Sequence, residues 1–263
     1  TRCAIVTGVQ TCALPILGRP DLLEKAASIA GTQEAGARQL YQSLNQIRAL
    51  PQYLSIWPGH GAGSACGKSL GAVPSTTLGY EGATSWAFRA PNEDNFVQQI
   101  LEGQPEPPTY FGRMKVQNRQ GPPILGTLPT PERLSPETVE ALQREGAQIV
   151  DARPKGEYTA GHVPGAINIQ ADEGFANWAG WMLDPERPVV FVAPESRIDG
   201  MVRGLIHVGI DTIAGYLPGI GPWTESGRSV ATLPHIAPQE LYQRASEFEI
   251  IDVRGQDEWD EGH

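Results

Sequence analysis

Apolar residues recur at helical spacing in the stretch GARQLYQSLNQIRAL, which lies within a helical pattern that runs over residues 20–50. The recurring positions are Leu40, Leu44, Ile47 and Leu50. This spacing predicts an α-helix with one apolar face. The apolar run YLSIW at residues 53–57 predicts a short strand, which leads into the glycine-rich loop PGHGAGSACGK. A strand that ends in such a loop is a common way to present site residues.

The second half of the chain alternates predicted helices and strands. A Pro-rich stretch predicts a linker near residue 125. After it, SPETVEAL begins a helix with Ser135 as N-cap and Pro136 in the first turn. Apolar runs at residues 147–153 and 187–193 predict buried strands, and the stretch MVRGLIHVG predicts a helix between strands. This alternation predicts a parallel sheet.

One segment of the chain occurs twice. IVDARPKGEYTAGH at residues 149–162 aligns without a gap on IIDVRGQDEWDEGH at residues 250–263. The aligned pairs are Asp151 with Asp252, Arg153 with Arg254, Glu157 with Glu258, Gly161 with Gly262 and His162 with His263. The separation of the copies is that of a domain, not of a solenoid repeat, so we expect a second unit that stops at His263, about a third of the way through, and a chain that is cut at its C-terminus.

Composition restricts the class of protein. The 263 residues carry a formal net charge of −10 and no basic run, which argues against a nucleic-acid surface because phosphate binding needs clustered Lys and Arg. No apolar window is long enough to span a membrane, and an apolar content of 40% suffices for a soluble globular core. Because the only cysteines are Cys3, Cys12 and Cys66, we expect no disulfide framework and a reducing compartment, the cytoplasm.

The pattern D-x-R followed by E-[YW]-x-x-G-H-V-P-G-A, complete at residues 151–166, resembles the rhodanese sulfurtransferase domain. The resemblance implies that the Asp, Arg and His tie loops around the sheet, so His162 and His263 are expected to be structural. Rhodanese chemistry needs a cysteine directly after the central strand, in a loop whose N–H groups and following helix lower its pKa. Ala193 stands at that position and Pro194 removes an N–H donor, so we expect the first unit to be inactive.

The N-terminal segment resembles a different family. GRPDLLE at residues 18–24 and WPGHGAGSACGKSLG at residues 57–71 resemble the later half of a metallo-β-lactamase-fold domain, of the type found in persulfide dioxygenases fused to rhodanese units. This resemblance covers residues 17–125. The predicted fold class is therefore α/β: the C-terminal part of a metallo-β-lactamase αββα fold, followed by a rhodanese-like parallel-sheet α/β domain and the start of a second one.

His60 is the candidate metal-binding residue. A lone histidine in a loop is usually not a ligand, but Gly59 and Gly61 let the backbone bring its imidazole into a cleft. The resemblance implies a ligand to the second metal in dinuclear zinc relatives, or a position beside the metal in mono-iron dioxygenases. Oxygen chemistry needs Fe(II) held by two histidines and one carboxylate, and Zn is the alternative metal. The remaining ligands, including the family's H-x-H-x-D-H motif, would lie upstream of Leu17.

Cys66 has two interpretations. It is either a small buried apolar residue, or a thiolate that is favoured by its glycine-rich setting and by Lys68 and that accepts or presents a persulfide. Arg19 and Asp21 match the family's GRxD element and are expected to form a structural charge pair. The tryptophans expected in the core or in an interface are Trp178, Trp181 and Trp223.

Residues 6–16, VTGVQTCALPI, fit neither a signal peptide nor a first strand. Reverse-translated, the stretch resembles the reading of a common short-read sequencing adapter joined to the insert. We therefore expect residues 1–16 to be non-native and the native reading to begin at or near Leu17. Removing residues 1–16 deletes Arg2 and no acid, so the net charge of −10 becomes −11.

Four segments follow: residues 1–16, non-native; 17–125, the metallo-β-lactamase part; 126–232, an inactive rhodanese-like domain; and 233–263, the N-terminal part of a second one. We expect the parent to be a cytoplasmic bacterial enzyme of sulfur metabolism that uses Fe(II) to oxidise a low-molecular-weight thiol persulfide, such as glutathione persulfide, with rhodanese sulfurtransferase modules. Two alternatives stay open: a zinc-dependent thioester hydrolase of the glyoxalase II type with rhodanese appendages, and a non-catalytic rhodanese-like docking module.

The expected partners are the thiol persulfide, with no nucleic acid and no membrane, and a homo-oligomer is left open. The 263-residue chain itself is expected to be inactive as a dioxygenase and to bind no stoichiometric iron.

Overall fold

The computed structural model describes most of the chain. The described residues are 19–22, 24, 31–58, 74–104, 106–254, 259, 260 and 262. The chain forms two compact units, each made of several segments. Unit 1 consists of Thr1–Pro131, Asp172–Pro188 and Asp199–Ile213, and unit 2 of Glu132–Ala171, Val189–Ile198 and Ala214–His263.

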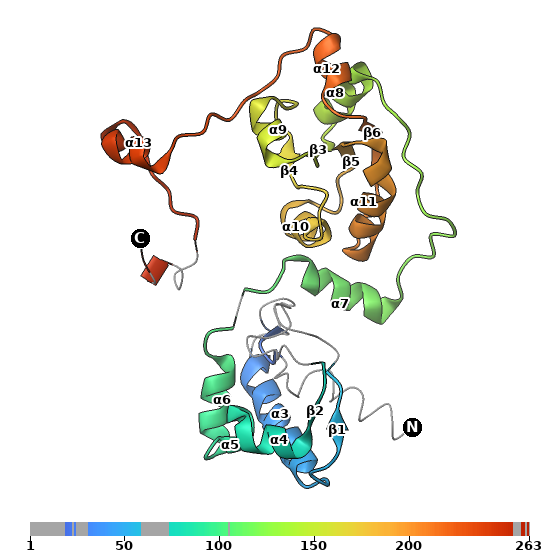
Figure 1. Ribbon diagram of the computed structural model, residues 1–263. Helices are drawn as coiled ribbons and strands as arrows, with labels where there is room; N and C mark the ends of the chain where they lie inside the picture. Colours follow the sequence, from blue (N-terminus) through green and yellow to red (C-terminus); the bar gives the residue numbers. More distant parts are fainter. Residues whose placement is uncertain are drawn as a thin grey trace. The chain divides into compact units, whose positions relative to one another are not determined.

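The N-terminal part of unit 1 is mainly helical (Figure 1). Its elements are α3 Thr32–Arg48, β1 Ser55–Ile56, β2 Thr76–Thr77, α4 Leu78–Thr84, α5 Trp86–Arg89 and α6 Glu93–Leu101. Helices α3 and α6 pack against each other. In the core that they form, the ring centroid of Phe96 lies 5.3 Å from that of Tyr41 and 5.6 Å from that of Trp86. Aromatic packing of this kind supplies much of the apolar burial of a small core.

The helix predicted around Leu40 is confirmed, but α3 is shorter than the sequence pattern. Leu44 is buried in the core, whereas Leu50 lies beyond the end of α3 and is 46% exposed. The prediction that Leu50 belongs to the apolar face is therefore wrong. The helix ends at Arg48 because Pro51 disfavours the helical conformation of the residue before it.

The strand predicted at residues 53–57 is confirmed only at its centre. Strand β1 pairs antiparallel with β2 over two residues. Tyr53 and Trp57, on either side of that short pairing, are exposed. Because the two strands pair over only two residues, they cover the side chain of Ile56 in part and leave the apolar residues around it exposed to solvent.

Unit 2 contains the parallel sheet that the alternation of helices and strands predicts, and this prediction is confirmed. Its strands are β3 Gln148–Asp151, β4 Ile167–Asn168, β5 Val189–Val192 and β6 Ile213–Leu217, in the order β4-β3-β5-β6. Strand β3 pairs parallel with both β4 and β5, with Val150 opposite Ile167 on one side and Phe191 on the other. Every residue of β3 and β5 is buried. This explains the continuous apolar sequence of β5, whereas β3 also buries the polar residues Gln148 and Asp151 at its two ends.

Helices follow the strands as the sequence predicts. The remaining helices are α7 Tyr110–Gln120, α8 Pro136–Arg144, α9 Lys155–Ala160, α10 Phe175–Met182, α11 Glu195–His207, α12 Gly221–Glu225, α13 Pro238–Gln243 and the 3₁₀ helix Ala245–Glu247. Ser135 caps α8, since its Oγ accepts the N–H of Thr138 at 3.3 Å. Val139 of α8 and Trp223 of α12 belong to the core of unit 2, together with residues of β3 and β5.

The expectation for the tryptophans holds for Trp223, which is buried, and its Nε1 donates to Ser229 O at 2.9 Å. Trp178 is exposed, so it is not a core residue, and the alternative of an interface stays a prediction. Helix α10 turns Phe175 and Ala179 inward, and Trp178 lies on another face of that helix. None of the helices in the described residues is long and apolar enough to cross a membrane.

Candidate functional site

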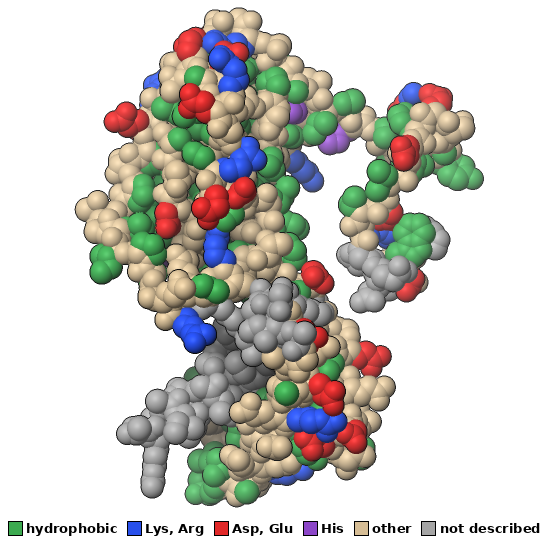
Figure 2. Space-filling model, turned by 180° about the vertical axis from the view of Figure 1, so that it is seen from behind, with side chains coloured by type: hydrophobic (Ala, Val, Ile, Leu, Met, Phe, Trp, Pro, Cys, Tyr) green, Lys and Arg blue, Asp and Glu red, His purple; other side chains and the backbone are tan. Residues whose placement is uncertain are grey.

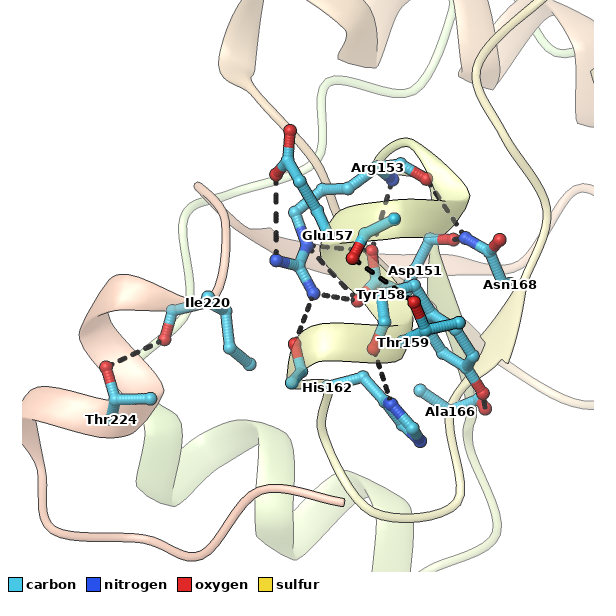
Figure 3. A network of polar contacts seen from close by, with 12 residues as sticks. Asp151, Arg153, Glu157, Tyr158, Thr159, His162, Ala166, Asn168, Ile220 and Thr224 are labelled. Carbon is cyan, nitrogen blue, oxygen red and sulfur yellow. Dashed lines mark hydrogen bonds and ion pairs between the residues drawn. The ribbon is translucent and has the colours of Figure 1, made fainter. Parts of the chain in front are cut away.

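The loop after β3 is held by a buried ion pair. Nε and Nη2 of Arg153 donate to the two carboxylate oxygens of Asp151 at 2.9 and 2.5 Å (Figure 3). The Arg153 N–H also donates to Asp151 Oδ1 at 3.1 Å, and Nη2 donates to Gly161 O at 2.8 Å. These contacts join the end of β3 to the end of α9. A buried pair that is satisfied in this way is stable only while both partners are present. We call this arrangement, Asp151–Arg153–Gly161, the Asp-Arg clasp.

His162 lies beside the clasp as a packing side chain. Its Nδ1 lies 2.8 Å from Tyr158 O, and because a carbonyl oxygen only accepts, Nδ1 carries the proton. Its ring stacks on that of Tyr158 at 3.8 Å between centroids. Tyr158 in turn donates its hydroxyl to Ala166 O at 2.7 Å. Burial raises the pKa of Tyr158, and the charge of Asp151 raises it further. The sequence-based interpretation of His162 as structural agrees with these contacts.

Ala193 follows β5 directly, at the point where a rhodanese nucleophile is expected. Its side chain is fully buried, and its N–H donates to Leu217 O at 3.1 Å. Helix α11 begins at Glu195, so only Ala193 and Pro194 connect β5 to the helix. A methyl group has no atom that can bind sulfane sulfur, and Pro194 offers no N–H to an anion. The described part of the chain contains no cysteine.

Tyr216 of β6 is the polar side chain near this loop that the sequence analysis missed. It is buried, and burial raises its pKa. The neighbouring Glu195 raises the pKa of Tyr216 further, by charge and by hydrogen bonding, whereas Arg133 lowers it. The connection after β5 therefore presents a phenol and a carboxylate rather than a thiol. In the sequence, the only signal for this role of Tyr216 is that a tyrosine stands inside the otherwise apolar strand IAGYL.

Asn168 is a second residue that the sequence analysis missed. Its side-chain N–H group donates to Asp151 O at 2.8 Å and to Arg153 O at 3.0 Å. Asn168 thus fixes the backbone of the clasp from the end of β4 (Figure 3). A lone asparagine at the end of a short strand carries no distinctive sequence pattern.

The family model of the rhodanese-like domain matches residues 135–225. This segment is a rhodanese-like domain. The clasp, His162 and Ala193 all lie within it, and its parallel sheet is the sheet of unit 2. A comparison with curated protein sequences finds no match for the chain.

Solved structures resemble the chain as well. The chain is 40% identical to a metallo-beta-lactamase from Staphylococcus aureus subsp. aureus COL, with a TM-score of 0.68, over 79% of this chain and 57% of that chain. It also resembles a rhodanese-related protein from Thermoplasma volcanium (22% identity, TM-score 0.32, 38% of this chain and 97% of that one). A thiosulfate sulfurtransferase from Pseudomonas aeruginosa shows 25% identity and a TM-score of 0.33 over 58% of this chain and 30% of that one.

The similarity to the metallo-beta-lactamase structure covers 79% of the chain. Neither the residues before the rhodanese-like domain nor the domain itself makes up so large a share of the chain. It therefore extends over parts of both. The predicted α/β fold class is confirmed: a metallo-β-lactamase-like part accompanied by a rhodanese-like domain. The chain spans little more than half the length of the metallo-beta-lactamase structure.

Arg19 and Asp21 form the charge pair that the sequence predicts. Arg19 Nη2 lies 2.6 Å from Asp21 Oδ2, and both side chains are buried. The other predicted site residues of this part, His60 and Cys66, lie outside the described residues, as do residues 1–16. Within the described ranges, no group of three or more His, Cys, Asp and Glu residues is arranged to hold a metal ion.

Proposed function

We propose that the parent of this chain is a cytoplasmic enzyme of sulfur metabolism that oxidises a low-molecular-weight thiol persulfide, such as glutathione persulfide. One persulfide, one O₂ and one water would give the free thiol, sulfite and two protons. The observation that carries the proposal is the 40% identity to a metallo-beta-lactamase structure over a stretch that includes at least part of the rhodanese-like domain. A sulfurtransferase-type domain beside a metallo-hydrolase fold favours a sulfur compound as substrate.

Fe(II) is the metal proposed for the parent, with Zn(II) as the alternative. The described residues do not by themselves fit a metal centre, so the choice of iron depends on the family resemblance. We propose His60 as a ligand of a second metal or a residue beside the metal, and Cys66 as a thiol that carries persulfide. Residues 1–16 are proposed to be adapter-derived.

We propose that the rhodanese-like domain does not transfer sulfur but serves as a docking module. The sulfur-transfer step needs a thiolate that attacks a sulfane sulfur and releases the donor anion. The buried methyl group of Ala193 has no lone pair for this attack. The methyl group of Ala193 therefore favours a non-catalytic docking role for this domain.

Residues 233–263 are proposed to be the N-terminal part of a second rhodanese-like unit. Nε and Nη2 of Arg254 donate to the carboxylate oxygens of Asp252 at 3.0 and 2.6 Å, and Nη1 donates to Gly262 O at 2.8 Å. The Arg254 N–H donates to Asp252 Oδ1 at 2.9 Å. The local geometry repeats that of the Asp-Arg clasp, which supports the proposal. Whether this unit is active depends on the residue after its own central strand.

Resequencing the gene, with adapter sequence trimmed from the reads, tests these proposals. Its complete reading frame is expected to encode H-x-H-x-D-H upstream of Leu17. The protein made from that frame and loaded with Fe(II) is expected to consume oxygen with glutathione persulfide. Zn-dependent hydrolysis of a glutathione thioester without oxygen uptake would replace the proposal with the glyoxalase II-type alternative.

A further inference from the structure

Helix α7 lies against α10 and the turn after α11, all within unit 1. Thr109 Oγ1 donates to Gly180 O at 3.1 Å, and Arg113 Nη2 donates to Val208 O at 2.5 Å. A Cβ atom at Gly180 would lie 2.4 Å from the ring of Tyr110, so only glycine permits this approach. The contact is thus closely fitted around Tyr110 and Arg113.

Arg113 is a cation whose hydrogen-bonding groups are not all used. Its Nε and Nη1 are buried and have no hydrogen-bond partner among the described residues. Within the same residues, no carboxylate pairs with its guanidinium, in contrast to Arg153. A buried N–H group without an acceptor is unfavourable, because it has lost its hydrogen bonds to water. The position therefore favours an acceptor that carries negative charge.

Two cavities adjoin Arg113, and they differ in character. The first, of about 370 Å³, has mostly apolar walls from Tyr110, Trp181, Leu183 and Pro185. The second, of about 380 Å³, is more polar, with Gln117 and Glu186 among its lining residues. Both volumes fall in the range of small-molecule sites.

We propose that the first cavity binds a small organic monoanion with an apolar body. Its carboxylate would accept hydrogen bonds from Arg113, and its apolar part would pack against Tyr110 and Trp181. Asp184 at the same cavity disfavours a multiply charged anion by repulsion. Because Nε and Nη1 are covered in the free protein, the proposed binding requires the guanidinium to turn toward the cavity. The turn would exchange the hydrogen bond from Nη2 to Val208 O for hydrogen bonds to the carboxylate, and the unbranched arginine stem permits it. The proposal is independent of persulfide oxidation.

The probe is 3-phenylpropionate, and its neutral control is 3-phenylpropanamide, which has the same body without the charge. Binding to the full chain is followed by ligand-observed NMR. The anion is expected to bind at least about tenfold more tightly than the amide, equivalent to about 1.4 kcal/mol. Equal affinity for both, or no binding of either at about 10 mM, overturns the proposal.

Variants assign the binding to Arg113. Arg113→Gln is expected to lower the affinity for 3-phenylpropionate by about tenfold or more and to remove the preference over the amide. Arg119→Gln, on an exposed position of the same helix, is the matched control and is expected to bind as the wild type does. Trp181→Ala is expected to weaken both ligands while keeping the preference for the anion. An equal loss in Arg119→Gln overturns the assignment; if Arg113→Gln does not fold, the wild-type comparison of anion and amide still decides.

Discussion

Residues 149–162 and 250–263 share one sequence pattern, and their Asp-x-Arg turns, at residues 151–153 and 252–254, share one local geometry but differ in burial. The distance between Nη2 and the carboxylate is 2.5 Å in the pair Arg153–Asp151 and 2.6 Å in the pair Arg254–Asp252. The side chain of Asp151 is 0% exposed, whereas that of Asp252 is 26% exposed. The Asp-x-Arg turn therefore forms its own hydrogen bonds wherever it stands, and its burial comes from the sheet.

The strand positions before the turn show the same difference. Ile149 is 2% exposed in β3, which has a parallel neighbour on each side, whereas its counterpart Ile250 is 59% exposed. In the described residues, the second copy belongs to no strand. Figure 2 shows hydrophobic side chains along this C-terminal segment. Ile250, Ile251 and Val253 of the segment are exposed. An apolar run of this kind is a hazard for aggregation until a sheet covers it.

The largest contrast is expected for the two aspartates. Asp151→Asn leaves the buried charge of Arg153 without its partner and is expected to cost about 3–5 kcal/mol of unfolding free energy. The matched change Asp252→Asn is expected to cost less than about 1 kcal/mol, because solvent screens an exposed pair. Denaturant unfolding of the two variants measures both values. Equal losses would contradict the assigned difference in burial.

A second contrast compares identical side chains. Ile149→Ala removes packing from the core of unit 2 and is expected to cost about 2–5 kcal/mol. Ile250→Ala is expected to change stability by no more than about 0.5 kcal/mol. Thermal and denaturant unfolding check both values. A large loss from Ile250→Ala would mean that the second copy is covered in solution.

The smallest contrast concerns alkaline pH. Since burial raises the folded-state pKa of Tyr158, its contribution to stability is complete below the ordinary tyrosine pKa of about 10 and is lost as pH rises through the higher folded value. Tyr158→Phe is expected to make the alkaline loss of stability shallower. It also removes the hydrogen bond to Ala166 O, which costs about 1 kcal/mol at neutral pH.

The aligned residue in the second copy is Trp259, which does not ionise. Trp259→Phe therefore serves as the control and is expected to leave the loss of stability at alkaline pH unchanged. Unfolding curves measured between neutral and alkaline pH give the comparison. If the unfolding free energy falls as steeply with rising pH in Tyr158→Phe as in the wild type, groups other than Tyr158 cause the loss of stability.

The sequence was sufficient for the features that depend on local or periodic signals. Ser135 caps its helix as predicted, because the cap is formed by neighbours in sequence. The centre of the run at 187–193, Val189–Val192, forms a buried strand, because its apolar, β-branched composition suits the centre of a parallel sheet. The exposure of Leu50 and Trp178 was not predictable in this way, because it depends on where a helix ends and which face a neighbour covers.

The site was predictable to a similar extent. The Asp-Arg clasp follows from its repeated motif, and Ala193 follows from its place after the strand. Tyr216 and Glu195 come together only when β6 lies beside β5, so no linear pattern predicts their interaction. His60 and Cys66 lie outside the described residues and stay predictions.

Sulfur transfer from thiosulfate to cyanide is the most direct test of the claim that the rhodanese-like domain is not catalytic. The assay compares the wild-type chain with Cys66→Ser, made in a chain that also carries Cys3→Ser and Cys12→Ser so that no cysteine remains. We expect Cys66→Ser to form no thiocyanate above the protein-free blank, and peptide mass spectra to find no added sulfur within residues 135–225. Thiocyanate formation by Cys66→Ser, together with a sulfur-bearing peptide from the β5–α11 connection, would contradict the account.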